Sequence, residues 1–324
     1  MSEEYASIGG QSPIRLTGRT TSVGSATGLP VWGMGLFGLP FVGFGVWITL
    51  MGLEVVDIDP SKVHAPMWII TVAGLVFFFA GLMVWGMGVR QVLHNKKLRL
   101  HAQQNPNIPA MSDYPWDTTG YSPPRWQPFI NGLGMAVFMT IFLSMFNWWA
   151  FWSGDGVIFV KIIVSVFDLI LISVWVATVK SIIHAFKFGK TRLEFGQFPY
   201  HTGDWFQVKI QLPAGLERVE SAKLVFRCVR EFYEVYRTGN KRSKRLVHEQ
   251  LWAEEQELSG AEIGQWPRFL NATFTIPAAA PGSDITTQAE EKPIFWELEM
   301  ELKVPGVDLK QQYLVPVYVQ DPEQ

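Results

Sequence analysis

The sequence predicts an α+β membrane protein in which four transmembrane helices, paired as two hairpins, precede an antiparallel β-sandwich of about seven strands. Two observations predict this class. Four long and nearly uncharged stretches fill about the first 185 residues, and the rest of the chain alternates polar and apolar residues between prolines and glycines. Because the hydrophobic content of 48% averages over these two halves, the distribution along the chain is more informative than the mean.

The four apolar stretches are each long enough to cross a bilayer. They are Pro30–Leu53, Pro66–Val89, Phe129–Trp152 and Val157–Ile183. About 24 residues at ~1.5 Å rise per residue span ~36 Å, which exceeds the ~30 Å hydrocarbon core of a membrane. The first stretch is full length and follows both acidic and basic residues, so we expect it to be retained rather than cleaved as a signal peptide.

Basic residues predict the orientation of the helices. Lys and Arg are concentrated before the first stretch, after the second and after the fourth, and such segments stay in the cytoplasm. The expected organisation is an N-terminal cytoplasmic arm at 1–29, a transmembrane domain at 30–186 with a Pro-rich cytoplasmic loop at 91–128, and a cytoplasmic β-sandwich at 187–324. The protein is therefore expected to be multi-pass, with both termini in the cytoplasm.

The Pro-rich loop between the hairpins interleaves six prolines with aromatic residues that include Trp116 and Trp126. Proline at this density disfavours helix and central strand alike. Two interpretations remain open. The loop lies against the membrane surface, or it is a docking segment whose aromatic side chains fill pockets on a partner.

Seven segments after residue 190 have the period of two that is typical of strands. They are Thr191–Phe195, Trp205–Leu212, Lys223–Tyr236, Leu246–Leu258, Phe269–Ile276, Ile294–Val304 and Lys310–Val319. The alternation is clearest in the sixth, where apolar residues from Ile294 to Val304 share one face and charged residues share the other. One face is expected to pack and the other to contact water, which favours a two-sheet sandwich.

Several turns and strand starts of this region carry a family resemblance. They are Phe274–Pro277, Pro281–Ser283, Ile294–Leu298, Val304–Asp308 and Val315–Val317. These segments resemble the second half of an arrestin-like, immunoglobulin-like sandwich domain. The layout of the whole chain is similar to bacterial multi-pass membrane proteins that join a few transmembrane helices to such a domain. The resemblance implies a fold used for protein contacts, located at the bacterial inner (cytoplasmic) membrane, and supplies no catalytic residue.

Asp168 is the strongest candidate for a functional residue, because it lies about three helical turns into the fourth stretch. A carboxyl group at that depth costs about 2.5 to 3.5 kcal/mol on insertion scales, so it should face the bundle and find a partner. If the third and fourth stretches form an antiparallel hairpin that turns at Gly154, residues equally far from Gly154 lie at the same depth. Thr140 then lies level with Asp168, and Ser144 lies about a turn nearer the outer end. The Thr140 hydroxyl is the expected partner. A structural acid, an ionic contact with another subunit and proton or ion handling all remain open.

Glycines in the first two stretches predict close helix packing, and the expected packing positions are Gly43, Gly45, Gly74 and Gly81. Residues Gly33–Gly38 spell the G-x-G-x-x-G fingerprint of dinucleotide-binding folds, but this motif needs a preceding strand in a βαβ unit. Here it opens an apolar stretch. The less favoured alternative is close approach of a lipid, a pigment or a partner helix.

Five basic residues crowd the tip between two long strands: Arg237, Lys241, Arg242, Lys244 and Arg245. They form a solvated hairpin tip, a contact with lipid headgroups, or a contact with an acidic partner surface. The formal net charge of −2 does not suggest a polyanionic partner, so no nucleic acid is expected.

The composition predicts no catalytic residue, metal or cofactor. The single cysteine, Cys228, excludes a multi-thiolate site from this chain alone and is expected to be a small buried residue. No two of the six histidines have the i, i+3 or i, i+4 spacing that puts two imidazoles on one metal. His201, although close to Asp204, is interpreted as part of a turn.

The functional expectation is a non-enzymatic integral-membrane scaffold or accessory subunit of a larger membrane complex, with the bilayer and other membrane-protein subunits as partners. That complex is a respiratory, photosynthetic or secretion assembly, or copies of this chain. The alternative is a small transporter or proton-handling protein that uses Asp168. A membrane-embedded hydrolase or metalloenzyme ranks third.

Overall fold

The computed structural model of the chain describes residues 8–19, 31–56, 66–104, 108–154, 157–213, 216, 218–238, 241–264, 267–285, 293–306 and 308–320. The chain divides into two compact units. A helical unit comprises Leu29–Asn95 and Trp126–Phe186, and a sandwich unit comprises Met1–Gly28, Lys96–Arg125 and Lys187–Gln324. The two units are described separately.

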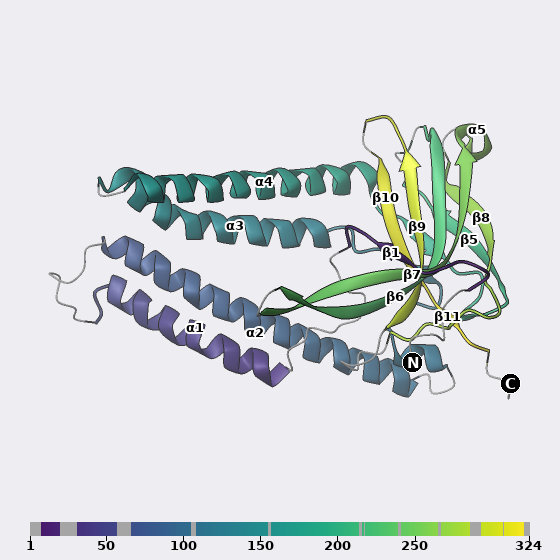
Figure 1. Cartoon of the computed structure of the whole chain (residues 1–324), viewed down its shortest axis with the longest axis horizontal. Coiled ribbons are helices and arrows are strands. Elements are labelled where there is room, and N and C mark those ends of the chain that lie inside the picture. Colours follow the sequence, from purple (N-terminus) through teal and green to yellow (C-terminus); the bar gives the residue numbers. More distant parts are fainter. Residues whose placement is uncertain are drawn as a thin grey trace. The chain divides into compact units, whose positions relative to one another are not determined.

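The helical unit confirms the expectation of four long apolar helices ahead of the sheets (Figure 1). They are α1 (Val31–Gly52), α2 (Met67–Gln104), α3 (Gln127–Asn147) and α4 (Ile158–Phe188). All four are long and apolar enough to cross a membrane. Large apolar side chains such as Trp32, Phe79 and Ile158 point outward, which is the arrangement a helix surrounded by lipid requires.

The loop expected from residue 91 begins later than the sequence analysis placed it. Helix α2 continues to Gln104, because residues 90–104 contain neither proline nor glycine and Pro106 is the first residue that blocks the helix. Beyond it lie a short 3₁₀ helix, Pro109–Ser112, and a two-residue strand, β2 (Gly120–Tyr121).

Two antiparallel sheets build the sandwich unit. One has the order β1-β7-β6-β9-β10 and the other β2-β3-β5-β8. The five-stranded sheet contains β1 (Ile14–Leu16), β6 (Ser221–Thr238), β7 (Lys241–Ser259), β9 (Ile294–Lys303) and β10 (Leu309–Val315). The four-stranded sheet adds β3 (Arg192–Glu194), β5 (Trp205–Gln211) and β8 (Phe269–Thr275) to β2, and the short helix α5 (Gly260–Ile263) follows β7.

All seven expected strands are present, and three short ones were not expected: β1, β2 and β4 (Tyr200–His201). The last expected strand is divided at Pro316, which has no N–H to continue the ladder. After this residue the second half of that strand, β11 (Val317–Tyr318), pairs in parallel with β4 as a separate two-stranded sheet.

Aromatic side chains from both sheets form the core of the sandwich. The ring of Phe206 in β5 lies 4.7 Å from that of Phe226 in β6, which lies 5.0 Å from Trp296 in β9. The expectation for Cys228 is confirmed, since it is fully buried in this core and burial raises the pKa of its thiol. These contacts join two sheets into one folded unit.

The division into units differs from the organisation expected from the sequence. The segment before α1 is not a separate arm, because Ile8 is buried in the sandwich core and β1 pairs with β7. The Pro-rich segment likewise belongs to the sandwich, where Ala110 and Met111 pack on the outer face of the five-stranded sheet. Three separate stretches of sequence therefore make one unit.

Candidate functional site

Three of the four predicted packing glycines lie at the contact between α1 and α2. A Cβ atom on Gly45 would lie 2.3 Å from the backbone nitrogen of Phe78, and one on Gly74 would lie 2.4 Å from that of Thr49. A Cβ on Gly81 would lie 2.6 Å from Val42 Cγ2, whereas a Cβ on Gly43 would meet nothing within 4 Å. The prediction is therefore wrong for Gly43, which lies on the open face of the helix.

Two further glycines at this contact were not predicted from the sequence. A Cβ on Gly38 would meet the Trp85 ring at 2.5 Å, and one on Gly52 would meet the backbone of Thr71 at 2.3 Å. Both lie at a spacing of seven residues from Gly45, one on each side. That heptad spacing was the available signal.

The expected partner of Asp168 is incorrect. Asn147 Nδ2 donates a hydrogen bond to Asp168 Oδ1 at 2.9 Å. Thr140 donates to the carbonyl of Ala136 and accepts from Trp175 Nε1 at 3.1 Å.

Asn147 lies roughly two turns beyond Thr140 along α3. Equal distances from Gly154 therefore do not place residues of α3 and α4 at the same level. Helix α3 ends in a π-helical segment, Trp148–Trp152. Ser144 is exposed and donates to Ile141 O, so neither hydroxyl reaches the carboxyl group.

Trp116 does not present an exposed contact surface, contrary to expectation. It is 3% exposed and packs in a cluster with Val229 and Phe295 on the outer face of the five-stranded sheet. Its indole Nε1 donates to the Tyr318 hydroxyl at 3.1 Å. Trp126, by contrast, is partly exposed and stacks edge-on against Phe186 in the helical unit.

The Trp116 segment is fastened by a buried carboxyl group. The Tyr318 hydroxyl lies 2.7 and 2.8 Å from the two carboxyl oxygens of Asp113. Asp113 is 9% exposed, and burial raises its pKa from 3.8 to about 6, although the bond from Tyr318 opposes this. Hydrogen bonds thus connect Asp113, Tyr318 and Trp116.

The raised pKa of Asp113 predicts a pH dependence of the sandwich unit. The stability that comes from the protonated carboxyl is fully present below pH 3.8 and is lost as the pH rises through about 6. The loss should amount to about 2 to 3 kcal/mol. The Asp113→Asn variant should lack this step in urea unfolding followed by tryptophan emission. Equal pH profiles for the two proteins would contradict the buried carboxyl.

A buried ionic network holds the segment before α1 on the five-stranded sheet. Arg19 lies 2.5 Å from Glu297 and 3.3 Å from Glu299, and Arg227 pairs with the same two carboxylates. Burial lowers the pKa of Arg227, although both glutamates oppose this. With Gln11, whose side chain bonds both backbone groups of Ala253, the network makes the N-terminal segment part of the sandwich.

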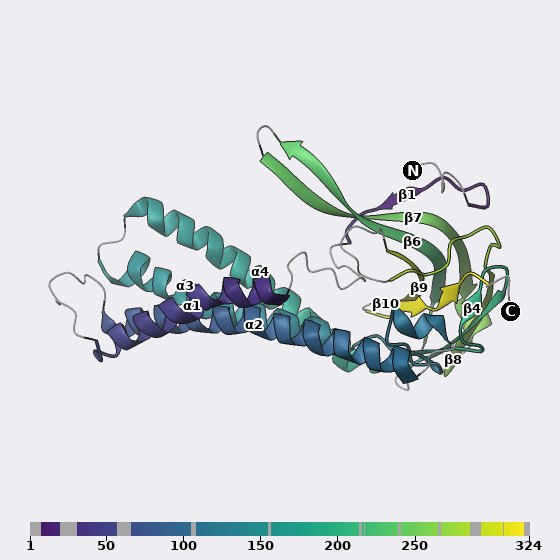
Figure 2. The same ribbon diagram turned by 90° about the horizontal axis from the view of Figure 1, so that it is seen from below.

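The predicted basic tip lies on a long two-stranded ribbon. Strands β6 and β7 pair as far as Thr238 and Lys241, and the ribbon projects from the sheet in Figure 2. Arg237, Arg242, Lys244 and Arg245 are exposed there, whereas the side chain of Lys241 lies outside the described residues. We call Phe232–Thr238 together with Lys241–Val247 the hairpin arm.

The exposed apolar side chains of the hairpin arm were not predicted from the sequence. Tyr233, Val235 and Tyr236 are 48%, 56% and 46% exposed. The regular alternation of the strand concealed them, because it predicts that one face of every strand is buried. Their neighbours in sequence, Glu234 and Arg237, were the signal that this part of the strand leaves the core.

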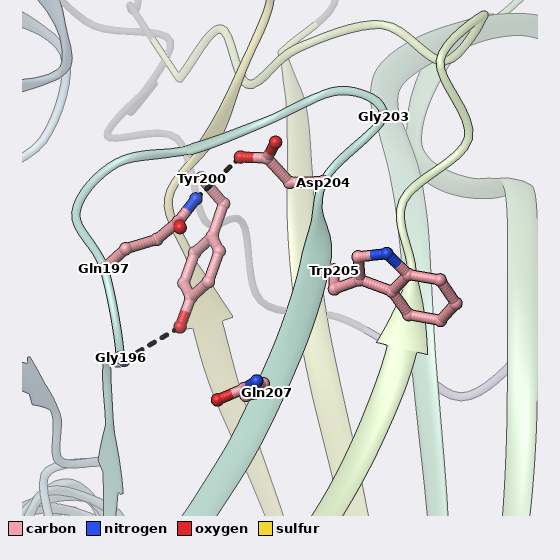
Figure 3. A pocket seen from close by; sticks show the side chains of 7 residues that line it. All are labelled: Gly196, Gln197, Tyr200, Gly203, Asp204, Trp205 and Gln207. Atoms are coloured by element: carbon pink, nitrogen blue, oxygen red, sulfur yellow. Dashed lines mark hydrogen bonds between the residues drawn. The ribbon is translucent and has the colours of Figure 1, made fainter.

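An open depression of about 340 Å³ lies at the turn before β5 and contains the residues closest to a catalytic pattern (Figure 3). Asp204 Oδ2 accepts from Gln197 Nε2 at 2.6 Å and from His201 N at 2.9 Å. The Tyr200 hydroxyl accepts from Gly196 N at 3.0 Å, and burial raises its pKa. These polar groups bind one another and form a turn, as expected for His201.

Among the residues that the structure describes, no group of three or more His, Cys, Asp or Glu side chains is placed to hold a metal ion. The two remaining buried ionisable side chains of β6 and β7 are Glu231 and His248, 3.2 Å apart. Both are 2% exposed, so neither faces a substrate.

Comparison with solved structures finds a distant likeness to the crystal structure of Spo0M, the sporulation control protein of Bacillus subtilis. The sequence identity is 12% and the TM-score 0.21, over 40% of this chain and 49% of that chain. The chain therefore spans about half of that protein's length. No family model matches the sequence, and no curated protein matches it.

Proposed function

We propose that this protein is a non-enzymatic scaffold or accessory subunit of a larger membrane complex, anchored by α1 to α4 and contacting its partners through these helices and the sandwich unit. One observation carries the proposal. The segments that flank the two helical hairpins, at 8–19, 108–125 and 187–320, fold into a single sandwich unit. The chain thereby connects both ends of each hairpin to the same folded unit.

This arrangement supports the proposed topology, because one folded unit cannot lie on both sides of a bilayer. The three segments then share a side, and each hairpin enters and leaves the membrane there. Basic residues such as Lys96, Lys97, Lys187 and Lys190 follow the apolar stretches of α2 and α4 on that side, which supports a cytoplasmic sandwich. The proposed location is the inner (cytoplasmic) membrane of a bacterial cell.

The polar chemistry of the sandwich supports a structural role. Buried or half-buried carboxyl groups with catalytic potential are engaged in internal contacts: Asp113 by Tyr318, Glu297 by two arginines, and Asp204 by Gln197. These contacts fix chain segments to the sheets. The proposed partners are respiratory, photosynthetic or secretion subunits, or further copies of this chain.

Gentle extraction and native electrophoresis, followed by mass spectrometry of the co-migrating proteins, test the proposal. We expect a complex larger than the monomer. Trp205 is 65% exposed on β5, so a partner held by that sheet should be lost from the Trp205→Ala variant and retained by Gln207→Ala on the same strand face. Migration only as a free monomer at native expression would contradict a subunit role.

Asp168 provides the test of the transport alternative. Because Asn147 donates directly to its carboxyl group, we expect Asp168 to fasten α4 to α3 rather than to carry ions. The Asp168→Asn variant in liposomes should leave proton and ion flux unchanged, whereas Asp168→Leu should weaken the packing of the two helices. Flux that is present in the wild type and abolished by Asp168→Asn would favour a transporter.

A further inference from the structure

The hairpin arm extends beyond every other strand of its sheet that the structure describes. Strand β9 pairs with β6 only as far as Arg230, and β1 pairs with β7 only between His248 and Gln250. An isolated two-stranded ribbon is marginally stable in water. An arm of this length is therefore expected to be more stable when it lies on a surface.

The two faces of the hairpin arm differ in charge. Directly opposed residues of an antiparallel pair share a face, and the pairs Tyr233–Leu246, Val235–Lys244 and Arg237–Arg242 alternate with the remaining ones. We call these six residues the Tyr233 face. It holds three cations and three apolar or aromatic side chains, and no acid.

The opposite face of the arm carries the only acid between Phe232 and Val247 that the structure describes. That residue is Glu234, and the Arg15 guanidinium contacts both of its carboxyl oxygens at 2.9 and 3.1 Å. The contact neutralises the carboxylate and holds the base of the arm to the N-terminal segment. The cations at the arm's tip are thus left without a nearby competing acid on their own face.

We infer that the Tyr233 face binds the anionic headgroups of a phospholipid bilayer. Tyrosine favours the boundary between headgroups and acyl chains, and anionic leaflets attract basic segments beside a membrane anchor. The three cations near the tip of the arm are suited to contact the headgroups. The apolar side chains beside them are suited to the boundary between headgroups and acyl chains. The inference rests on the proposed membrane anchoring, which keeps the sandwich unit close to a bilayer.

A protein partner fits this face less well. A stable protein contact covers about 800 Å² on each partner and centres on a buried aromatic anchor in a pocket. The Tyr233 face has six residues on a narrow ribbon, and its three charges lie at one end. A diffuse anionic surface needs neither a pocket nor a large area.

The experiment places a fluorescent probe on the Tyr233 face of the arm. Cys228 is the only native cysteine and is fully buried, so Val235→Cys supplies a single reactive thiol on the Tyr233 face, directly opposite Lys244. The full-length labelled protein is reconstituted in phosphatidylcholine vesicles, with or without phosphatidylglycerol. Lipids with a nitroxide near the headgroup serve as quenchers.

We expect the probe's fluorescence to be quenched in the vesicles with phosphatidylglycerol and little quenched in phosphatidylcholine alone. High salt should markedly reduce the quenching, because it screens the attraction between the cations and the headgroups. The Arg242→Glu/Lys244→Glu variant should lose most of the quenching. A control with the same charge change elsewhere on the sandwich, Arg218→Glu/Lys310→Glu, should retain it.

Four results would overturn the inference. Equal quenching in both lipids would remove the role of anionic headgroups, and shielding of the probe only in native membranes would assign the arm to a protein partner. A protein that floats with neutral vesicles but is never quenched refutes the arm's role alone. A protein that does not float at all refutes the membrane anchoring and this inference with it.

Discussion

Replacing Gly45 with alanine is expected to disrupt the packing of α1 on α2, whereas the same change at Gly43, two residues away, is expected to be harmless. The added Cβ at position 45 would lie 2.3 Å from Phe78 N, 2.6 Å from Phe78 Cα and 2.8 Å from Gly74 O. All three are backbone atoms that cannot rotate away, so the helices must separate. Forcing extra atoms into a packed contact usually costs about 1 to 3 kcal/mol. We expect the stability lost by Gly45→Ala to lie near the upper end of this range.

The Gly43→Ala control should leave the stability of the helical unit unchanged or raise it. Its Cβ meets nothing within 4 Å, and alanine is the better helix former by about 1 kcal/mol. Titration with SDS, followed by circular dichroism of the helical signal, should therefore show a lower midpoint for Gly45→Ala and an unchanged or higher one for Gly43→Ala. Similar midpoints for both variants would refute the described helix contact.

The second large effect is expected at Glu297, whose side chain is 2% exposed between Arg19 and Arg227. The Glu297→Ala variant leaves Arg227 buried with only the more exposed Glu299 as counter-ion. Removing one member of a buried ion pair costs about 3 to 5 kcal/mol. Because Glu299 still pairs with both arginines, we expect a loss of stability near the lower end of this range. Arg19 should also release the N-terminal segment.

Glu301, on the same strand, provides the matched control. It pairs with Lys310, which is 62% exposed, and exposed pairs contribute about 1 kcal/mol or less. Thiol labelling of Cys228 during a urea titration measures the opening of the sandwich core directly, because this cysteine is unique and fully buried. Glu297→Ala should be labelled at clearly lower urea than Glu301→Ala. Equal midpoints would mean that the network contributes no net stability.

The parts of the fold that depend on local sequence could be predicted from it. Length and apolarity are sufficient to identify the four helices, and a period of two identifies seven strands. Strand β1 could not be found in this way, because three residues carry no useful periodicity. Its place depends on contacts with residues more than two hundred positions away, such as Gln11 with Ala253 and Arg19 with Glu297.

The candidate sites show the same limit. Glycine in an apolar helix predicted a close contact, but only the rotation of α1 separates Gly45 from Gly43. Asp168 was identified from its depth, while its partner depended on how α3 and α4 are staggered along their length, which no residue pattern announced. Trp116 had the composition of a docking residue, and tertiary contacts with Tyr318 and Val229 buried it.

The pairing of β1 with β7 also constrains how the protein is made. Leu16 precedes its partner His248 by 232 positions, and synthesis at 5 to 20 residues per second delivers that partner roughly 10 to 50 seconds later. During this interval the first segment has no sheet to join. The ribosome completes both helical hairpins before the strand that receives β1 exists, so closing the sandwich around the N-terminal segment is among the last steps of biogenesis.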